Sequence, residues 1–62
     1  MITEKMRLYK TAYSPMLEQY VYINKVMENQ GLIIYHCEVW YPEERKYSEY
    51  MFSEYELTDF CL

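Results

Sequence analysis

The sequence has few of the residues that catalytic, metal and phosphate-binding sites require. Its 62 residues contain one Gly, one His, two Cys and two Pro. A single Gly cannot build a glycine-rich phosphate loop, and a structural zinc site takes about four ligands at paired spacings. Cys37 and Cys61 are far apart in the chain, and His36 has no second His to accompany it. We therefore expect no metal and no cofactor.

A catalytic dyad is not expected either. His36 and Cys37 are neighbours in the sequence, and neighbouring side chains of a strand point to opposite faces, so the two cannot act together as base and nucleophile. The carboxylates of the second half of the chain fall in turns and near its end, where water is normally present. The sequence predicts that the protein is not an enzyme.

Long apolar segments are missing as well. The longest uninterrupted apolar runs, such as Leu32 to Tyr35, are far shorter than the roughly 20 residues that cross a bilayer. Residues 1–10 show no apolar signal segment, and two cysteines are too few for a disulfide scaffold. We expect one small domain, residues 1–62, in a reducing cytoplasm.

Aromatic residues are what the sequence has in excess. Nine Tyr, two Phe and one Trp make up 19% of the chain, and hydrophobic residues make up 52%. A core of this size cannot enclose so many rings. Several Tyr are therefore expected at the surface, where Tyr and Trp often form binding sites. The alternative is that Tyr serves only as a good strand former with a polar tip, suited to half-buried positions of a sheet.

The net charge of −4 is unevenly distributed. Residues 1–37 carry four Lys or Arg against three Glu, whereas residues 38–62 carry two against seven Asp or Glu. An acidic second half suits a basic partner and argues against nucleic acid, whose phosphates are bound by Lys and Arg. A single-stranded nucleic-acid binder that stacks bases on Tyr and Trp is the weakest alternative. Another reading is that the acids only keep an aromatic domain soluble and monomeric.

Alternation of side chains predicts two strands in the first half of the chain. Residues 6–13 alternate loosely, and residues 18–27 are rich in β-branched and aromatic side chains. A helical alternative exists for residues 13–28, because apolar residues such as Met16 and Tyr20 recur there at helical spacing. The Tyr-Val-Tyr-Ile stretch within this segment favours the strand.

A β-hairpin is predicted next. Residues 28–31, Glu-Asn-Gln-Gly, contain the Asn and Gly of a tight turn that needs positive φ. The strand that follows, residues 32–41, divides into two faces. The expected core face carries Ile33, Tyr35, Cys37, Val39 and Tyr41, and the opposite face carries Leu32, Ile34, His36, Glu38 and Trp40.

A second hairpin follows through the charged turn of residues 42–46, with a fourth strand over residues 47–52. Ser53 and Glu56 then form a helix-start signal with room for about one turn. We expect a short 3₁₀ turn there and a brief last strand.

The segment that closes this pattern is Tyr50-Met51-Phe52-Ser53-Glu54-Tyr55-Glu56-Leu57. It resembles the ending of small SH3-like barrels, in which an aromatic strand leads into a one-turn 3₁₀ element ending in Glu-Leu. The resemblance covers about residues 18–60 and implies binding through an aromatic-lined face. The chain lacks the paired-aromatic opening motif and the acidic loop of peptide-binding SH3 domains, so a proline-rich ligand is not expected. The fold class predicted is mainly β, a small antiparallel sheet or SH3-like barrel of about four to five strands.

An outward aromatic surface bordered by acids is the predicted site, with Trp40 as its main residue. The alternative is that Trp40 plugs the end of a barrel or seals a homodimer. The predicted partner-binding residues are Tyr20, Tyr22, Ile34, His36, Trp40 and Tyr50, with the acids Glu43, Glu44, Glu49 and Glu54.

These features predict a binding protein that inhibits or modulates a protein partner. It resembles the small accessory proteins that phages make against host defence systems or host enzymes. In one variant of this hypothesis, the acids of residues 43–59 mimic the phosphates of DNA and occupy a basic groove. The alternative from a different class is a small structural or assembly subunit that forms a homo-oligomer through the same aromatics. We expect no membrane partner, and a monomer or a homodimer.

Overall fold

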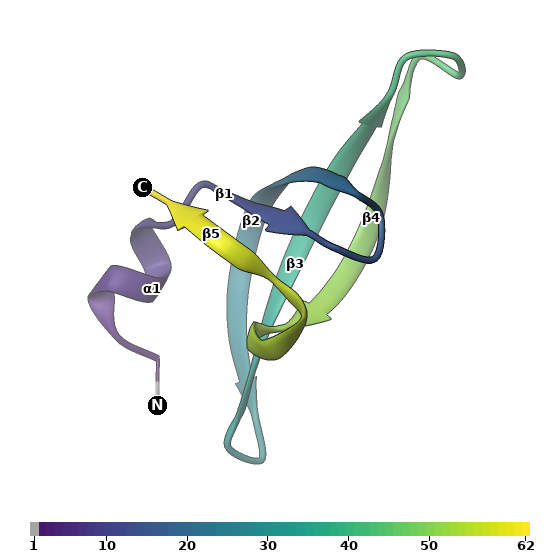
Figure 1. Ribbon diagram of the computed structural model, residues 1–62. Helices are drawn as coiled ribbons and strands as arrows, with labels where there is room; N and C mark the ends of the chain where they lie inside the picture. The colour runs from purple at the N-terminus through teal and green to yellow at the C-terminus, as the bar shows by residue number, and fades with distance from the viewer. Residues whose placement is uncertain (1) are drawn as a thin grey trace.

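The computed structural model describes residues 2–62, which form one antiparallel sheet of five strands with a short helix before it (Figure 1). The strand order is β4-β3-β2-β1-β5, and the sheet is open, with β4 and β5 at its edges. The predicted mainly β fold is confirmed, and of the two predicted forms the structure has the small antiparallel sheet. The elements are α1 (Glu4–Leu8), β1 (Thr11–Ser14), β2 (Gln19–Asn29), β3 (Leu32–Tyr41), β4 (Lys46–Ser53), the 3₁₀ turn η1 (Glu54–Glu56) and β5 (Thr58–Cys61).

The three long strands β2, β3 and β4 form a meander. Gln30 and Gly31 connect β2 to β3 with φ of 52° and 82°, the positive values that a two-residue hairpin of type I′ requires at both positions. The predicted hairpin is therefore confirmed. The β3–β4 hairpin, with its turn at residues 42–45, projects beyond the rest of the molecule in Figure 1.

The sheet curls, so that β1 and β5 lie across one face of β3 (Figure 1). The pairing of β2 with β3 shifts register between Ile23 and Lys25, and such an irregularity bends a strand and increases its twist. The end of β2 that lies before this shift pairs with β1, and β1 pairs in turn with β5. One face of β3 is thereby enclosed.

The core lies in this enclosed space. Four of the five residues predicted for the core face of β3 are buried, and the fifth, Tyr41, is half-buried. The buried apolar residues are Ala12, Val21, Ile33, Tyr35, Cys37, Val39, Phe52 and Leu57. The face of β3 and β4 that points away from them is called the outer face below.

The first predicted strand is wrong over most of its length. Residues 4–8 are helical, because the Thr3 Oγ1 accepts a hydrogen bond from the Met6 N–H at 3.2 Å and caps the helix. Met6 packs against the core from this helix. The helical alternative for residues 13–28 is also wrong, since β2 occupies residues 19–29 and pairs on both sides.

The predicted ending of the chain is confirmed. The Ser53 N–H donates to Glu56 Oε1 at 2.8 Å, which is the hydrogen bond of a capping box. A single 3₁₀ turn follows, and β5 is the brief last strand.

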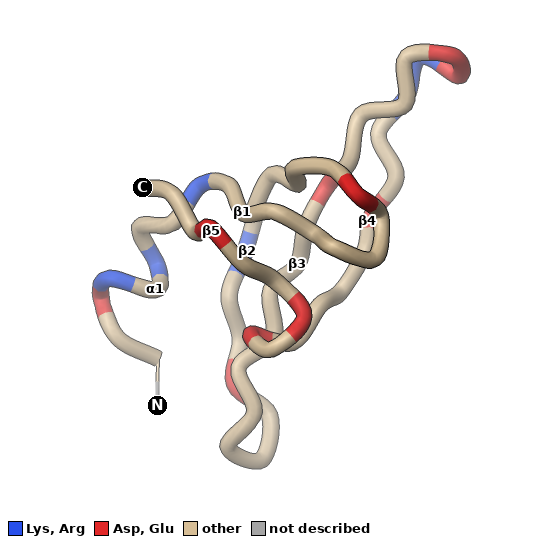
Figure 2. Tube along the Cα trace, viewed as in Figure 1, with Lys and Arg blue, Asp and Glu red and all other residues tan. Residues whose placement is uncertain are grey.

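Charged residues are unevenly distributed over the molecule. Figure 2 shows mainly basic residues along α1, acidic residues around η1, and both signs together at the β3–β4 turn. In the described part of the chain, no helix has both the length and the apolar character needed to cross a membrane.

Candidate functional site

The outer face can be mapped from the pairing of β2, β3 and β4. Residues directly opposite each other on neighbouring strands place their side chains on the same face. Tyr22, Glu38 and Glu49 form one row across the three strands, and Trp40 lies opposite Tyr47 in the next row. Aromatic rings and carboxylates are therefore neighbours on this face.

Three aromatic side chains are joined here through Tyr47, which contacts the other two, and we call them the aromatic cluster: Tyr22, Trp40 and Tyr47. The ring centroids of Trp40 and Tyr47 are 4.9 Å apart, and those of Tyr22 and Tyr47 are 6.3 Å apart. Their exposed fractions are 52%, 40% and 53% in chain order. Rings that pack on each other and still expose about half of their surface leave an apolar area that a partner can cover.

Tyr20 extends this aromatic surface along β2. It is exposed and makes an edge-to-face contact with Tyr13 of β1, with ring centroids 5.2 Å apart. It lies two residues from Tyr22 in a regular part of the strand, so both side chains are on one face.

Two carboxylates oppose each other beside the aromatic cluster. Glu38 and Glu49 are direct cross-strand partners, and neither forms an ion pair with any residue of the described chain, 2–62. Lys46 directly precedes Tyr47 in the chain, and its Nζ lies 3.6 Å from Glu44 Oε1 instead. Like charges placed directly opposite each other destabilise a sheet.

Glu49→Gln is therefore expected to stabilise the protein. Removing one of two facing charges relieves repulsion of a few tenths of a kcal/mol to about 1 kcal/mol, which raises Tm by roughly 1 to 8 °C in a domain of this size. Thermal unfolding followed by circular dichroism measures the change. Glu43→Gln, in the exposed turn, is the matched control and should leave Tm within about 1 °C of the native value. A Tm for Glu49→Gln at or below that of the control would contradict this reading of the pair.

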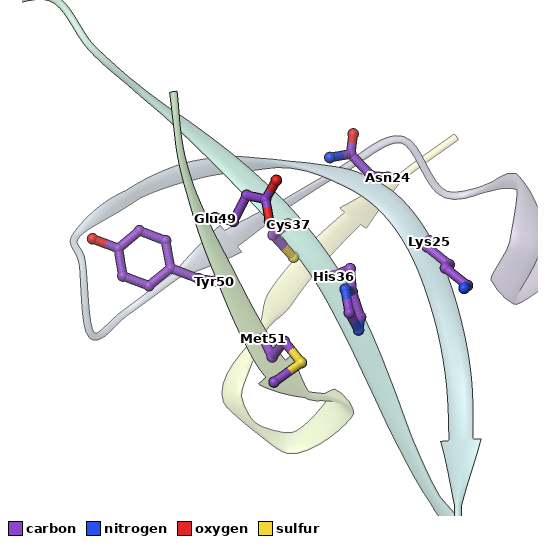
Figure 3. A pocket seen from close by; sticks show the side chains of 7 residues that line it. All are labelled: Asn24, Lys25, His36, Cys37, Glu49, Tyr50 and Met51. Atoms are coloured by element: carbon purple, nitrogen blue, oxygen red, sulfur yellow. The ribbon is translucent and has the colours of Figure 1, made fainter. Parts of the chain in front are cut away.

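A shallow hollow of about 470 Å³ adjoins the carboxylate pair on its other side. Figure 3 shows the side chains around it, which come from β2, β3 and β4. His36 lies between Lys25 and Met51 in the strand pairing, and its Nε2 atom is enclosed without a hydrogen-bond partner. The lining residues are Asn24, Lys25, His36, Cys37, Glu49, Tyr50 and Met51.

The groups that could support catalysis are kept apart. Cys37 is 1% exposed on the core face, whereas His36 is on the outer face of the same strand. Burial raises the pKa of the Cys37 thiol from 9.0 to about 11, so the thiol is protonated at neutral pH and is a poor nucleophile. Within residues 2–62, no three His, Cys, Asp or Glu side chains are grouped closely enough to hold a metal ion.

The two cysteines are expected to differ sharply in reactivity. Cys61 is exposed and Cys37 is buried. An alkylating reagent at pH 8 should modify Cys61 within minutes and Cys37 only after denaturant is added, because a thiol must be accessible and ionised to react. Intact-mass spectrometry counts the modified thiols, and Cys61→Ser serves as the control that removes the fast reaction. Rapid double modification of the native protein would contradict the burial of Cys37.

Alkaline pH should also destabilise the fold. The Cys37 thiol stays neutral in the folded chain up to about pH 11 but ionises near pH 9 once exposed, so unfolding releases a proton between these values. The stabilisation is present below pH 9 and is lost as pH rises toward 11, by roughly 3 kcal/mol at most, since each pKa unit corresponds to about 1.4 kcal/mol. Burial also raises the pKa of Tyr35, so ionisation of its hydroxyl at alkaline pH destabilises the fold in the same way.

The structure brings most of the predicted aromatic residues together. Tyr20, Tyr22 and Trp40 lie exposed on the outer face, and Ile34 and His36 lie half-buried on it. Tyr50 was predicted for this surface, and that prediction is wrong. It pairs with Cys37 and so faces the core side, where its hydroxyl lies 2.6 Å from that of Tyr41.

The predicted acids are spread over three places. Glu49 is on the outer face, Glu43 and Glu44 are in the β3–β4 turn, and Glu54 is in η1. Glu54 lies near the buried Tyr35, whose pKa its charge helps to raise, so it is remote from the aromatic cluster. Only the first three can border a ligand bound there.

Tyr47 is the residue that sequence reasoning missed. It contacts both other members of the aromatic cluster. Counting outward from the turn at residues 42–45 would have paired it with Trp40, since Tyr41 lies opposite Lys46. Met51 and Lys25 were also missed, because they become neighbours of His36 only through the pairing of separate strands.

Comparison of the chain with protein-family models, with curated proteins and with solved structures gives no match.

Proposed function

We propose that this chain is a non-enzymatic binding protein that docks on a protein partner through the aromatic cluster of its outer face. The observation that carries the proposal is the contact of Tyr47 with both Tyr22 and Trp40 while each of the three rings stays 40% to 53% exposed. An exposed apolar patch lowers solubility, so its presence favours a partner that covers it. Tyr and Trp are also the side chains that contribute most to binding energy at protein interfaces.

The role that fits this surface is inhibition or modulation of the partner, as in the small accessory proteins that phages use against host defence systems or host enzymes. The order of a long hairpin, a charged turn, an aromatic strand and a 3₁₀ turn resembles that of SH3-like binding modules and so supports a binding role. Such a protein would act in the host cytoplasm.

Docking through aromatics is favoured over mimicry of DNA. A mimic needs a continuous line of negative charge along one surface. The acids of the second half of the chain are instead divided among the outer face, the β3–β4 turn and the region around η1 (Figure 2). A complex that tolerates high salt would support docking, because screening weakens charge-based binding most.

A homo-oligomeric assembly subunit is the second candidate. It is favoured by the open edge of β4, whose eight residues pair on one side only, since unpaired edges add strands from other chains. Mass determination in solution separates the two candidates.

Affinity capture from host-cell lysate tests the proposal. The tagged native chain is compared with Trp40→Ala and with Tyr55→Ala, a control that removes a ring 82% exposed in η1. We expect one protein to be retained by the native chain and by Tyr55→Ala, and lost with a folded Trp40→Ala. Equal retention by all three, or recovery of the chain alone, would overturn the proposal.

A further inference from the structure

We propose that the outer face binds an arginine-bearing segment of its partner, with a guanidinium group held between the aromatic cluster and the Glu38–Glu49 pair. This inference rests on the proposed function and specifies the chemistry of the partner. Its basis is the placement of two uncompensated carboxylates in one row with Tyr22 and next to the row of Trp40 and Tyr47.

The geometry allows one cation to contact both sets of groups. The row containing Glu38 and Glu49 is two residues along the strands from the row of Trp40 and Tyr47, which corresponds to about 7 Å. A guanidinium between the rows is within about 6 Å of a ring centroid, the range of a cation–π contact. It also reaches the carboxylates with its remaining N–H donors.

Among residues 2–62, no cationic side chain is paired with Glu38 or Glu49. Lys25 lies opposite His36, in the row beyond the carboxylates and away from the rings. Lys46 lies opposite Tyr41, beyond the rings, and its Nζ is paired with Glu44. The carboxylates therefore face each other without compensation in the free protein, and a bound cation relieves that repulsion.

Arginine fits better than lysine for a physical reason. Its planar guanidinium stacks on an aromatic face and presents parallel donors to a carboxylate, whereas an ammonium acts as a compact, strongly hydrated charge. The aromatic rings of the site therefore favour a planar guanidinium over an ammonium group. The two carboxylates favour a positively charged group over a negative one.

The test uses three decapeptides in which Gly alternates with Arg, with Lys or with Glu. Trp40 is the only Trp of the chain, so its fluorescence reports binding at the site. The variant Glu38→Gln/Glu49→Gln is compared with Glu43→Gln/Glu44→Gln, and each double change moves the net charge from −4 to −2. Circular dichroism establishes that both variants are folded.

We expect the Arg peptide to bind more tightly than the Lys peptide, and the Glu peptide not to bind. The change at Glu38 and Glu49 should weaken Arg-peptide binding by about tenfold or more, and the change in the turn by less than about threefold. Equal weakening by the two variants, or no binding of the Arg peptide, would overturn the inference.

Failure of this inference is distinguishable from failure of the proposed function. A captured partner that is lost with Trp40→Ala but retained in full by Glu38→Gln/Glu49→Gln leaves the docking function standing and overturns the arginine site. Arg-peptide binding that depends on Glu38 and Glu49, without any captured partner, supports the site and overturns the function.

Discussion

Phe52→Ala is expected to lower the free energy of unfolding by about 3 to 5 kcal/mol and to leave much of the chain unfolded at 37 °C. Phe52 is 2% exposed and stacks on Tyr50 with ring centroids 5.8 Å apart. It also lies opposite Tyr35, the largest fully buried side chain. A 62-residue chain buries too little surface to absorb the loss of a central ring, since the whole stability of such a domain is about 5 kcal/mol.

Urea denaturation followed by circular dichroism measures this loss. Tyr55→Ala is the matched control, because it also removes a ring close to the end of β4 but one that is 82% exposed. The control should unfold within about 0.5 kcal/mol of the native protein. Equal midpoints for Phe52→Ala and Tyr55→Ala would show that the sheet does not enclose the core described above.

Tyr47→Ala is expected to weaken the complex with the captured partner by about 30-fold or more while the chain stays folded. The reason is that Tyr47 contacts both Tyr22 and Trp40, so its removal takes away the centre of the aromatic cluster. Central aromatic side chains of an interface typically contribute 2 kcal/mol or more, which corresponds to about 30-fold in Kd.

Titration calorimetry with the purified partner measures the affinity. Tyr47→Phe serves as a second variant that keeps the ring, and it should bind within about fivefold of the native protein. If the Ala and Phe variants lost affinity equally, the hydroxyl rather than the ring would be the group that binds. If neither lost affinity, the partner would bind elsewhere.

Local signals in the sequence were sufficient to predict the two hairpins and the 3₁₀ turn with the short last strand. The Gln30-Gly31 turn, the strict alternation of residues 32–41 and the Ser53–Glu56 capping box each depend on neighbours within a few residues. Such features are encoded in the segment that forms them, and the structure agrees with each prediction.

Features that depend on distant residues were not predictable in this way. The helix of residues 4–8 needed the Thr3 cap to be recognised against a loose alternation that fits a strand as well. The curl of the sheet depends on the register shift near Asn24, and this shift cannot be recognised from the pattern of apolar residues. The pairing of β1 with β5 joins segments from opposite ends of the chain.

The positions of the candidate site residues were predicted only in part, because each strand was assigned its faces separately. Trp40, Tyr20 and Tyr22 were placed correctly, since each belongs to a strand with clear alternation. Tyr50 was placed outward although it shares a side with Phe52, which is buried. Tyr47 was overlooked because its importance depends on cross-strand partners, Trp40 on β3 and Tyr22 on β2.

Hydroxyl-radical footprinting of the chain, alone and in its captured complex, tests most directly the claim that the outer face is the binding surface. Oxidation of Tyr22, Trp40 and Tyr47 should fall several-fold in the complex, while oxidation of Tyr55 and of Leu62, which are exposed away from that face, stays unchanged. Protection of Tyr55 or Leu62 with the aromatic cluster still fully oxidised would contradict the claim.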